Sequence, residues 1–186
     1  MASSAPDQLT PRARQIVTAA QELLDEGGLD ALSMRNLAER LGIRASSLYK
    51  HFASKEALEA ALISAGFEEQ GALFDAALEA SDEPLLAMAE VYRAYARRHP
   101  ALYRLMYDRS LNRSLLAPGS EESAVVPVVR AAGEDRDLAR AAWAFAHGMT
   151  ILELNGRFPP DADLDAAWQR GLTALQASIS VDARRS

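Results

Sequence analysis

Residues 33–55, SMRNLAERLGIRASSLYKHFASK, contain the pattern that decides the fold of this chain. Ser33 is suited to cap a helix, because its hydroxyl can accept a hydrogen bond from a backbone N–H of the first turn. Leu37 and Leu41 then recur at helical spacing, and Gly42 favours the left-handed conformation that ends many helices. These signals predict a first helix of roughly nine residues that stops at a tight turn.

A second, shorter helix follows the glycine. Its apolar positions, Ala45, Leu48 and Phe52, recur at steps of three and four residues. Its other face has no carboxylate and consists of Arg44, Ser46, Ser47, Tyr49, Lys50 and His51. Hydroxyls, a phenol and cations are the groups that hold phosphates and contact base edges in DNA. Two short helices joined by a glycine turn are typical of a helix-turn-helix, whose second helix enters the major groove.

The run LAERLGIRASSLYKHFASKEAL resembles the DNA-binding domain of the TetR family of transcriptional regulators. The matching positions are Leu37, Ala38, Leu41, Gly42, Ile43, Leu48, Tyr49, His51, Phe52, Ser54 and Lys55. The chain departs from the family at Arg44, where Ser or Thr is common, and at Ser46, where Gly or Pro is common. The resemblance implies that both positions face DNA, so the departures bear on the operator sequence and not on the fold.

The resemblance also implies a set of DNA contacts. Ser47, Tyr49, His51 and Lys55 are expected to hold phosphates, while Arg44, Ala45, Ser46 and Lys50 face the bases or the groove edge. With Ser33 and Arg35 from the preceding helix, the predicted DNA-binding residues are Ser33, Arg35, Arg44, Ala45, Ser46, Ser47, Tyr49, Lys50, His51 and Lys55.

Composition limits the alternatives. The chain has 186 residues, of which 49% are hydrophobic and 25% charged, as expected for one or two globular domains. The absence of cysteine excludes disulfides and thiolate metal sites. The chain contains no apolar run of about 18 residues, so no membrane span is expected. The polar start MASSAPDQL lacks the apolar core of a signal peptide. These features predict a soluble, cytoplasmic protein.

The net charge of −6 alone would argue against a nucleic-acid partner. However, residues 1–57 hold seven Lys or Arg and seven Asp or Glu, so the acidic excess lies in the remainder of the chain. A neutral N-terminal part is compatible with DNA binding if its cations gather on one face. Charge by itself favours an ordinary solvated surface, and only the motif reverses that interpretation.

The flanking signals predict an all-α fold of about nine helices. Thr10 and Pro11 begin a helix that Gly27 ends, and Ser54 begins another that continues to about Ala80. Further helices are predicted near residues 84–98, 100–107, 135–155 and 162–179, with a loop at 110–121. Residues 122–132 could form a weak helix, but Pro127 and four valines argue against it. The predicted domains are a helix-turn-helix bundle at 10–55 and a ligand-sensing and dimerisation domain at 56–181, with flexible tails at 1–9 and 182–186.

Two helices in the C-terminal part suggest a homodimer. The segment 135–155 is apolar on nearly all sides, so a partner subunit is a natural source of its second wall. The stripe of the last helix either packs within its own subunit or forms a symmetric four-helix interface, and we favour the interface. The predicted interface residues are Leu152, Leu164, Trp168, Leu172, Leu175 and Ile179.

The segment WAFAHGMTILELNGRFP is similar to the WHG type of C-terminal sensor domain found in some TetR-like regulators. The residues that carry this resemblance are Trp143, His147, Gly148, Leu152, Glu153 and Phe158. His147 either contacts a ligand or is a core histidine satisfied by a neighbour. The predicted ligand set is Met88, Tyr92, Tyr95, Tyr103, Met106, Tyr107, Trp143 and His147, which suits a mostly apolar effector. For any single tyrosine or methionine of this set, ordinary core packing is the more favoured interpretation.

Catalysis finds little support in the sequence. The three histidines lie in separate elements, and the zinc-protease, di-iron, nucleophile-elbow and phosphate-loop motifs are all missing. We therefore predict no cofactor, no metal and no enzyme activity. The sequence favours a homodimeric repressor that binds a pseudo-palindromic operator in double-stranded DNA and is released by a small, largely apolar effector. The alternatives are a helical ligand-binding or interaction protein without DNA binding and, less favoured, an all-helical enzyme.

Overall fold

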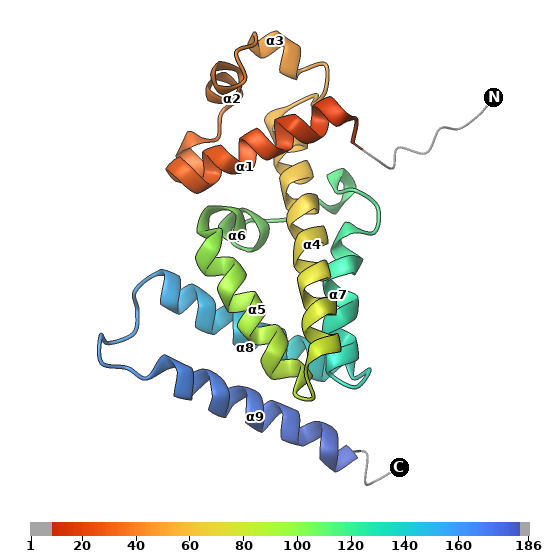
Figure 1. The fold of residues 1–186 in the computed structure, drawn as a ribbon, viewed down its shortest axis with the longest axis vertical. Helices are drawn as coiled ribbons and strands as arrows, with labels where there is room; N and C mark the ends of the chain where they lie inside the picture. The colour runs from red at the N-terminus through yellow and green to blue at the C-terminus, as the bar shows by residue number, and fades with distance from the viewer. Residues whose placement is uncertain (1–8, 183–186) are drawn as a thin grey trace, which may run out of the picture. The chain divides into compact units, whose positions relative to one another are not determined.

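The computed structural model describes residues 9–182, and the side chains of residues 9–177. Within that part of the chain every regular element is helical, with nine α-helices and one 3-10 helix (Figure 1). The predicted all-α fold is therefore confirmed. Apart from Leu9 and Asp182, the predicted tails lie outside the described residues.

The helices form two compact units. The first comprises Met1–Phe67 and His99–Glu121, and the second comprises Glu68–Arg98 and Glu122–Ser186. This division differs from the predicted boundary between residues 55 and 56. The reason is that helix α6 (Pro100–Tyr107) belongs to the first unit, where Leu102 and Tyr103 are completely buried.

The first unit contains the predicted helix-turn-helix. The motif consists of α2 (Met34–Arg40) and α3 (Ala45–Leu48). Besides these and α6, the unit contains α1 (Pro11–Ala31), the first part of α4 (Lys55–Ala80) and the 3-10 helix η1 (Arg113–Leu115). Thr10 caps α1 by accepting a hydrogen bond from the backbone N–H of Ala13. Gly28 adopts a φ of 69°, so α1 kinks there and continues one turn further than predicted.

Helix α6 is joined to α1 by a polar pair as well as by its apolar face. The Nδ1 atom of His99, which precedes α6, lies 3.1 Å from both carboxylate oxygens of Asp25 on α1. The segment after α6 is tied to α4, because the backbone N–H of Ala117 donates to the hydroxyl of Ser64 over 2.9 Å. The first unit is therefore larger than a three-helix bundle.

Within the described residues, the second unit consists of four helices and the C-terminal part of a fifth. It holds the remainder of α4, α5 (Pro84–Arg98), most of α7 (Ser120–Ala131), α8 (Arg136–Leu154) and α9 (Leu164–Asp182). The weak helix predicted at 122–132 is a full helix of 12 residues with Pro127 inside it. Among the described helices, none is long and apolar enough to cross a membrane.

Candidate DNA-binding surface and ligand cavity

The helix-turn-helix is fixed by a cap, a turn and an apolar anchor. The hydroxyl of Ser33 accepts a hydrogen bond from the backbone N–H of Asn36 over 3.0 Å, as predicted for the N-cap of α2. Gly42 has a φ of 63°, a left-handed conformation that favours glycine and turns the chain toward α3. Leu48 of α3 is completely buried. Because Leu48 points into the core, the residues on the opposite side of α3 face outward.

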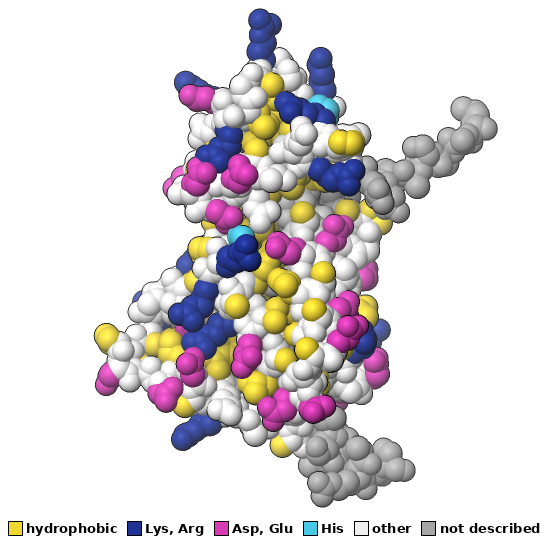
Figure 2. Space-filling view, in the orientation of Figure 1, with side chains coloured by type: hydrophobic (Ala, Val, Ile, Leu, Met, Phe, Trp, Pro, Cys, Tyr) yellow, Lys and Arg dark blue, Asp and Glu magenta, His cyan; other side chains and the backbone are white. Residues whose placement is uncertain are grey.

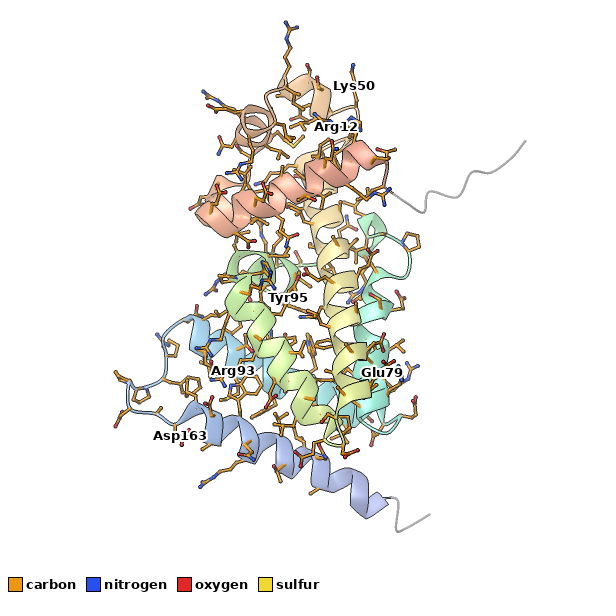
Figure 3. All side chains as sticks on the ribbon, in the orientation of Figure 1. Arg12, Lys50, Glu79, Arg93, Tyr95 and Asp163 are labelled. Carbon is orange, nitrogen blue, oxygen red and sulfur yellow. The ribbon has the colours of Figure 1, made fainter. Side chains whose placement is uncertain are left out.

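That outer face is accessible. Tyr49 keeps 52% of its surface exposed, and Arg44, Lys50 and His51 are also exposed. Figure 2 shows dark blue side chains projecting at the end of this unit where Figure 1 places α2 and α3, and Figure 3 shows Lys50 among them. The remaining predicted DNA-binding residues are exposed at Arg35 and Ser46 and half-buried at Ser33, Ala45, Ser47 and Lys55.

The cations of this unit are not all available to a nucleic acid. Arg40 is bound to Glu26, and its Nη1 also lies 3.4 Å from Glu22. The hydrogen bond from Arg40 holds the pKa of the Glu26 carboxyl below its usual value. Lys55 lies 3.4 Å from Glu59, yet 42% of its side chain remains exposed. Arg44 and Lys50, in contrast, have no such acidic neighbour within the described part of the chain.

A small cavity of about 40 Å³ lies inside the second unit. It is apolar, and its lining residues are Phe74, Leu85, Met88, Ala89, Tyr92, Val128, Ala142, Trp143, Ala146 and Leu172. Three of the predicted ligand-binding residues, Met88, Tyr92 and Trp143, are among them. The structure thus brings these three together from α5 and α8, two helices that are far apart in the sequence.

Polar groups meet at the edge of this cavity. The hydroxyl of Tyr92 lies 3.4 Å from Nδ1 of His147, which is half-buried on α8. The indole of Trp143 stacks on the His147 ring, with 5.9 Å between ring centroids. His147 therefore has a protein neighbour, as a core histidine would, and also lies beside the cavity, as a ligand contact would. The structure is compatible with both of the predicted roles.

The other predicted ligand-binding residues lie elsewhere. Tyr95 is buried in the second unit, where its hydroxyl donates to Glu69 over 3.3 Å, and it does not line the cavity. Tyr103, Met106 and Tyr107 belong to the first unit. There the rings of Tyr103 and Tyr107 have centroids 5.0 Å apart and take part in that unit's own packing. Sequence spacing alone did not reveal that α5 and α6 join different cores.

Two of the predicted interface residues are covered by their own chain. Trp168 and Leu172 keep only 4% and 2% of their surface exposed, so they are core residues of the second unit and not free for a partner. Trp168 packs edge-on against Phe145 of α8, and its indole N–H donates to Glu153. The stripe is therefore covered by helices of its own chain at these two positions.

The remaining interface residues are more accessible. Leu152 is 41% exposed, and Leu164 and Leu175 are half-buried. The side chain of Ile179 lies outside the described residues.

The sequence interpretation missed a buried ion-pair cluster and a second cavity. Arg93 on α5 contacts Glu153 on α8 and Asp165 on α9, which lie 60 and 72 residues further along the chain. Burial alone would lower the pKa of Arg93, but the hydrogen bonds that its guanidinium donates to Asp165 and Glu153 outweigh burial and raise that pKa. A cavity of about 340 Å³ lies beside the cluster. No local pattern relates residues at such separations.

Comparison with known families divides the chain into an N-terminal and a C-terminal part, with residues 99–121 inside the C-terminal match. A family model described as "Bacterial regulatory proteins, tetR family" matches residues 16–62, which include all of α2 and α3. A second, described as "Tetracyclin repressor-like, C-terminal domain", matches residues 85–175. That range includes the segment from Trp143 to Phe158 on which the WHG resemblance rests.

Individual proteins agree with the family matches. An uncharacterised HTH-type transcriptional regulator of Mycobacterium tuberculosis is 30% identical over 174 residues, covering 88% of this chain and 79% of that protein. A protein of unknown function from Rhodococcus sp. RHA1 has a TM-score of 0.77 at 23% identity, covering 94% of this chain and 98% of that one. A TetR variant from Acinetobacter baumannii AYE in complex with minocycline has a TM-score of 0.64 at 26% identity, covering 93% and 97%.

Proposed function

This chain belongs to the tetR family of bacterial regulatory proteins, and on that premise we propose that it acts as a homodimer on a pseudo-palindromic operator. It is a DNA-binding transcriptional regulator and not an enzyme. Repression is the mode of action that the resemblance implies. A protein acting on the genome of a bacterium works in the cytoplasm, and we place it there.

The observation that carries the proposal is the exposed face formed by α3 and the turn that follows it at residues 49–51. Because Leu48 is buried and Tyr49 and Lys50 are exposed, the outer face is available to a DNA groove without unfolding of the unit. We assign phosphate contacts to Ser47, Tyr49, His51 and Lys55. Arg44, Ala45, Ser46 and Lys50 would contact bases or the groove edge, with Ser33 and Arg35 supporting from α2.

The proposed dimer places two such helices on one DNA duplex. Two recognition helices related by a twofold axis fit successive major grooves when they lie about 34–36 Å apart. Support for pairing through the second unit comes from the outward faces of α8 and α9. Ala141, Ala144 and Leu152 of α8 and Ala167 and Ala174 of α9 are exposed although they are apolar. Two helices with such faces from each protomer suit a four-helix interface.

The proposed effector enters the second unit. The 40 Å³ cavity is lined by Met88, Tyr92 and Trp143, and His147 supplies a polar group at its edge. This volume is small, so a ligand there must favour a conformation in which the cavity is larger. An effector shifts the equilibrium between DNA-binding and released dimers only by its differential affinity for the two states. The solved TetR variant that holds minocycline supports a ligand of this kind.

Selection of bound sequences from random duplexes, followed by gel-shift titration at fixed salt, tests the DNA-binding surface. We expect a two-part site with inverted half-sites. Tyr49→Ala removes a positioning contact, so it should weaken binding to the selected site and to random DNA alike, by about tenfold.

Leu115→Ala is the matched control, because Leu115 is 45% exposed in the same unit but lies on η1. Equal affinities of the Tyr49→Ala and Leu115→Ala variants would exclude Tyr49 from the DNA contact.

A further inference from the structure

The larger cavity of the second unit, about 340 Å³, lies between α5 and α9. Its floor is apolar and consists of Leu86, Ala89, Trp168 and Leu172. Glu90, Arg93, Asp165 and Gln169 supply its polar groups. Ligand cavities in proteins typically measure roughly 300–1,000 Å³ and combine an apolar lining with a few placed polar groups. This cavity has a volume in that range and brings apolar and polar side chains together in equal number.

Arg93 is held rigidly at this cavity. Its Nε donates to Glu153 over 3.0 Å, and its guanidinium lies 5.5 Å from the centroid of the Trp168 ring. The other carboxylate oxygen of Glu153 accepts the indole N–H of Trp168. Only 8% of the Glu153 side chain and 17% of the Arg93 side chain are exposed. The inner side of the guanidinium is therefore held by Glu153 and Trp168.

The outer side of the guanidinium has a much weaker partner. Nη1 of Arg93 donates to Asp165 over 2.5 Å, but the Asp165 side chain is 87% exposed in the first turn of α9. The hydrogen bond from Arg93 lowers the pKa of the Asp165 carboxyl. Solvent-exposed ion pairs of this kind add little to stability. A carboxylate from solution can therefore replace Asp165 without disturbing the buried pair.

We propose that the cavity between α5 and α9 binds an organic monocarboxylate with an apolar body. Its carboxylate takes the place of Asp165 on Arg93, and its body lies against Leu86, Ala89 and Leu172. A guanidinium presents two parallel N–H groups that match a carboxylate in geometry as well as charge. Nothing in the proposed function requires this ligand, and its binding can be measured without DNA.

An organic cation is the competing ligand class, because Glu90 and Asp165 are exposed at the same cavity. Two features favour the anion. The face of Trp168, which would otherwise attract a cation, is already covered by Arg93. Among the charged residues that line the cavity, Arg93 is also the one with a buried partner, whereas the Glu90 and Asp165 side chains are exposed.

Fluorescence of Trp168 provides a direct readout, since the chain has only two tryptophans. In a Trp143→Phe variant, Trp168 is the remaining one, and octanoate should change its emission in a saturable way. Shortening the probe to hexanoate should weaken binding by about fourfold for each methylene removed. Octylammonium and 1-octanol have the same apolar body with a different head. The proposal is overturned if either binds as tightly as octanoate.

Substitutions at the cluster provide the second test. Asp165→Asn removes the internal competitor and should tighten octanoate binding by about two- to fivefold. Asp161→Asn removes the same charge from an exposed position outside the cavity lining and should have a smaller effect. Arg93→Gln combined with Glu153→Gln removes the anchor without leaving a buried carboxylate alone, and should weaken binding at least tenfold. Equal effects of the two aspartate variants, or unchanged binding by the double variant, would refute the site.

Discussion

At Gly71 the backbone of α4 lies very close to the backbone of α7. A Cβ built on Gly71 would lie 2.4 Å from the backbone carbonyl oxygen of Ser123. In a regular helix this carbonyl would accept a hydrogen bond from the backbone N–H four residues later. That residue is Pro127, which has no N–H. Gly71 and Pro127 both weaken isolated helices. Here they lie at a contact between α4 and α7 where a side chain on residue 71 has no room.

Gly71→Ala should therefore destabilise the protein, although alanine is the better helix former. Because a backbone atom cannot move as a side-chain end does, we expect a loss of about 1–3 kcal/mol in the free energy of unfolding. Urea titration measures this loss. Ala72→Leu adds a larger group at the next, exposed position and should change stability by less than about 0.5 kcal/mol. Comparable stability of the two variants would contradict the close approach.

Individual residues differ in how far the sequence could reveal their role. Tyr49 and Lys50 are exposed as the motif predicted, because a short local pattern determines which side of α3 is anchored. Trp168 was predicted at an interface but is buried against Phe145 and Glu153. An apolar stripe shows that a face is covered, but it does not show whether the cover belongs to the same chain.

Helices are predictable where their ends carry local signals. The starts of α1 and α8 follow Thr10 and Asp135, each of which accepts hydrogen bonds from the first turn. Helix α3 is shorter than predicted and ends at Leu48, although Phe52 is buried as its spacing required. Helix α7 runs over 12 residues although it contains Pro127, and its backbone packs closely against Gly71 of α4. Tertiary contacts, which the local sequence does not encode, decide both cases.

Helix α2 allows the capping role of Ser33 to be separated from its proposed DNA contact. Ser33→Ala removes the side-chain acceptor for the N–H of Asn36 and should cost about 1 kcal/mol of stability. Ser33→Asn and Ser33→Asp both keep an acceptor, so both should unfold close to the wild type. If the helix start lies at a phosphate, only the aspartate should weaken DNA binding, and the effect should shrink as salt is raised.

Ser110→Asp places the same charge at an exposed position in the same unit and serves as the control for the gel shifts. Should the Ser33→Asp and Ser33→Asn variants bind DNA equally well, Ser33 acts only as a cap.

For the whole molecule, the two activities reside in different units. The first unit carries α3, and the second carries both cavities and the proposed interface. A single α3 of four residues offers few base contacts, and in the proposed homodimer the affinity for an operator comes from two copies bound together. Linking two modules raises apparent affinity by about 10²–10⁴-fold without any new contact, and that gain disappears when the link is lost.

Leu152→Lys should therefore abolish operator binding without touching DNA. Leu152 is 41% exposed on α8, so the protomer should tolerate lysine there, while a buried lysine at the proposed interface would separate the subunits. Light scattering should report monomers, and gel shifts should show a loss of at least a hundredfold. Val126→Lys is the control, since Val126 is 52% exposed on α7.

Leu172→Lys gives a different result if the structure is right. Leu172 is 2% exposed and lines both cavities, so lysine there should lower the thermal midpoint instead of yielding folded monomers. If Leu172→Lys gave folded monomers and Leu152→Lys gave dimers, the interface would lie on the apolar stripe of α9 that the sequence predicted. Monomers from Val126→Lys alone would move it to α7. Because each variant changes one face of the second unit, the three results together identify the face that pairs.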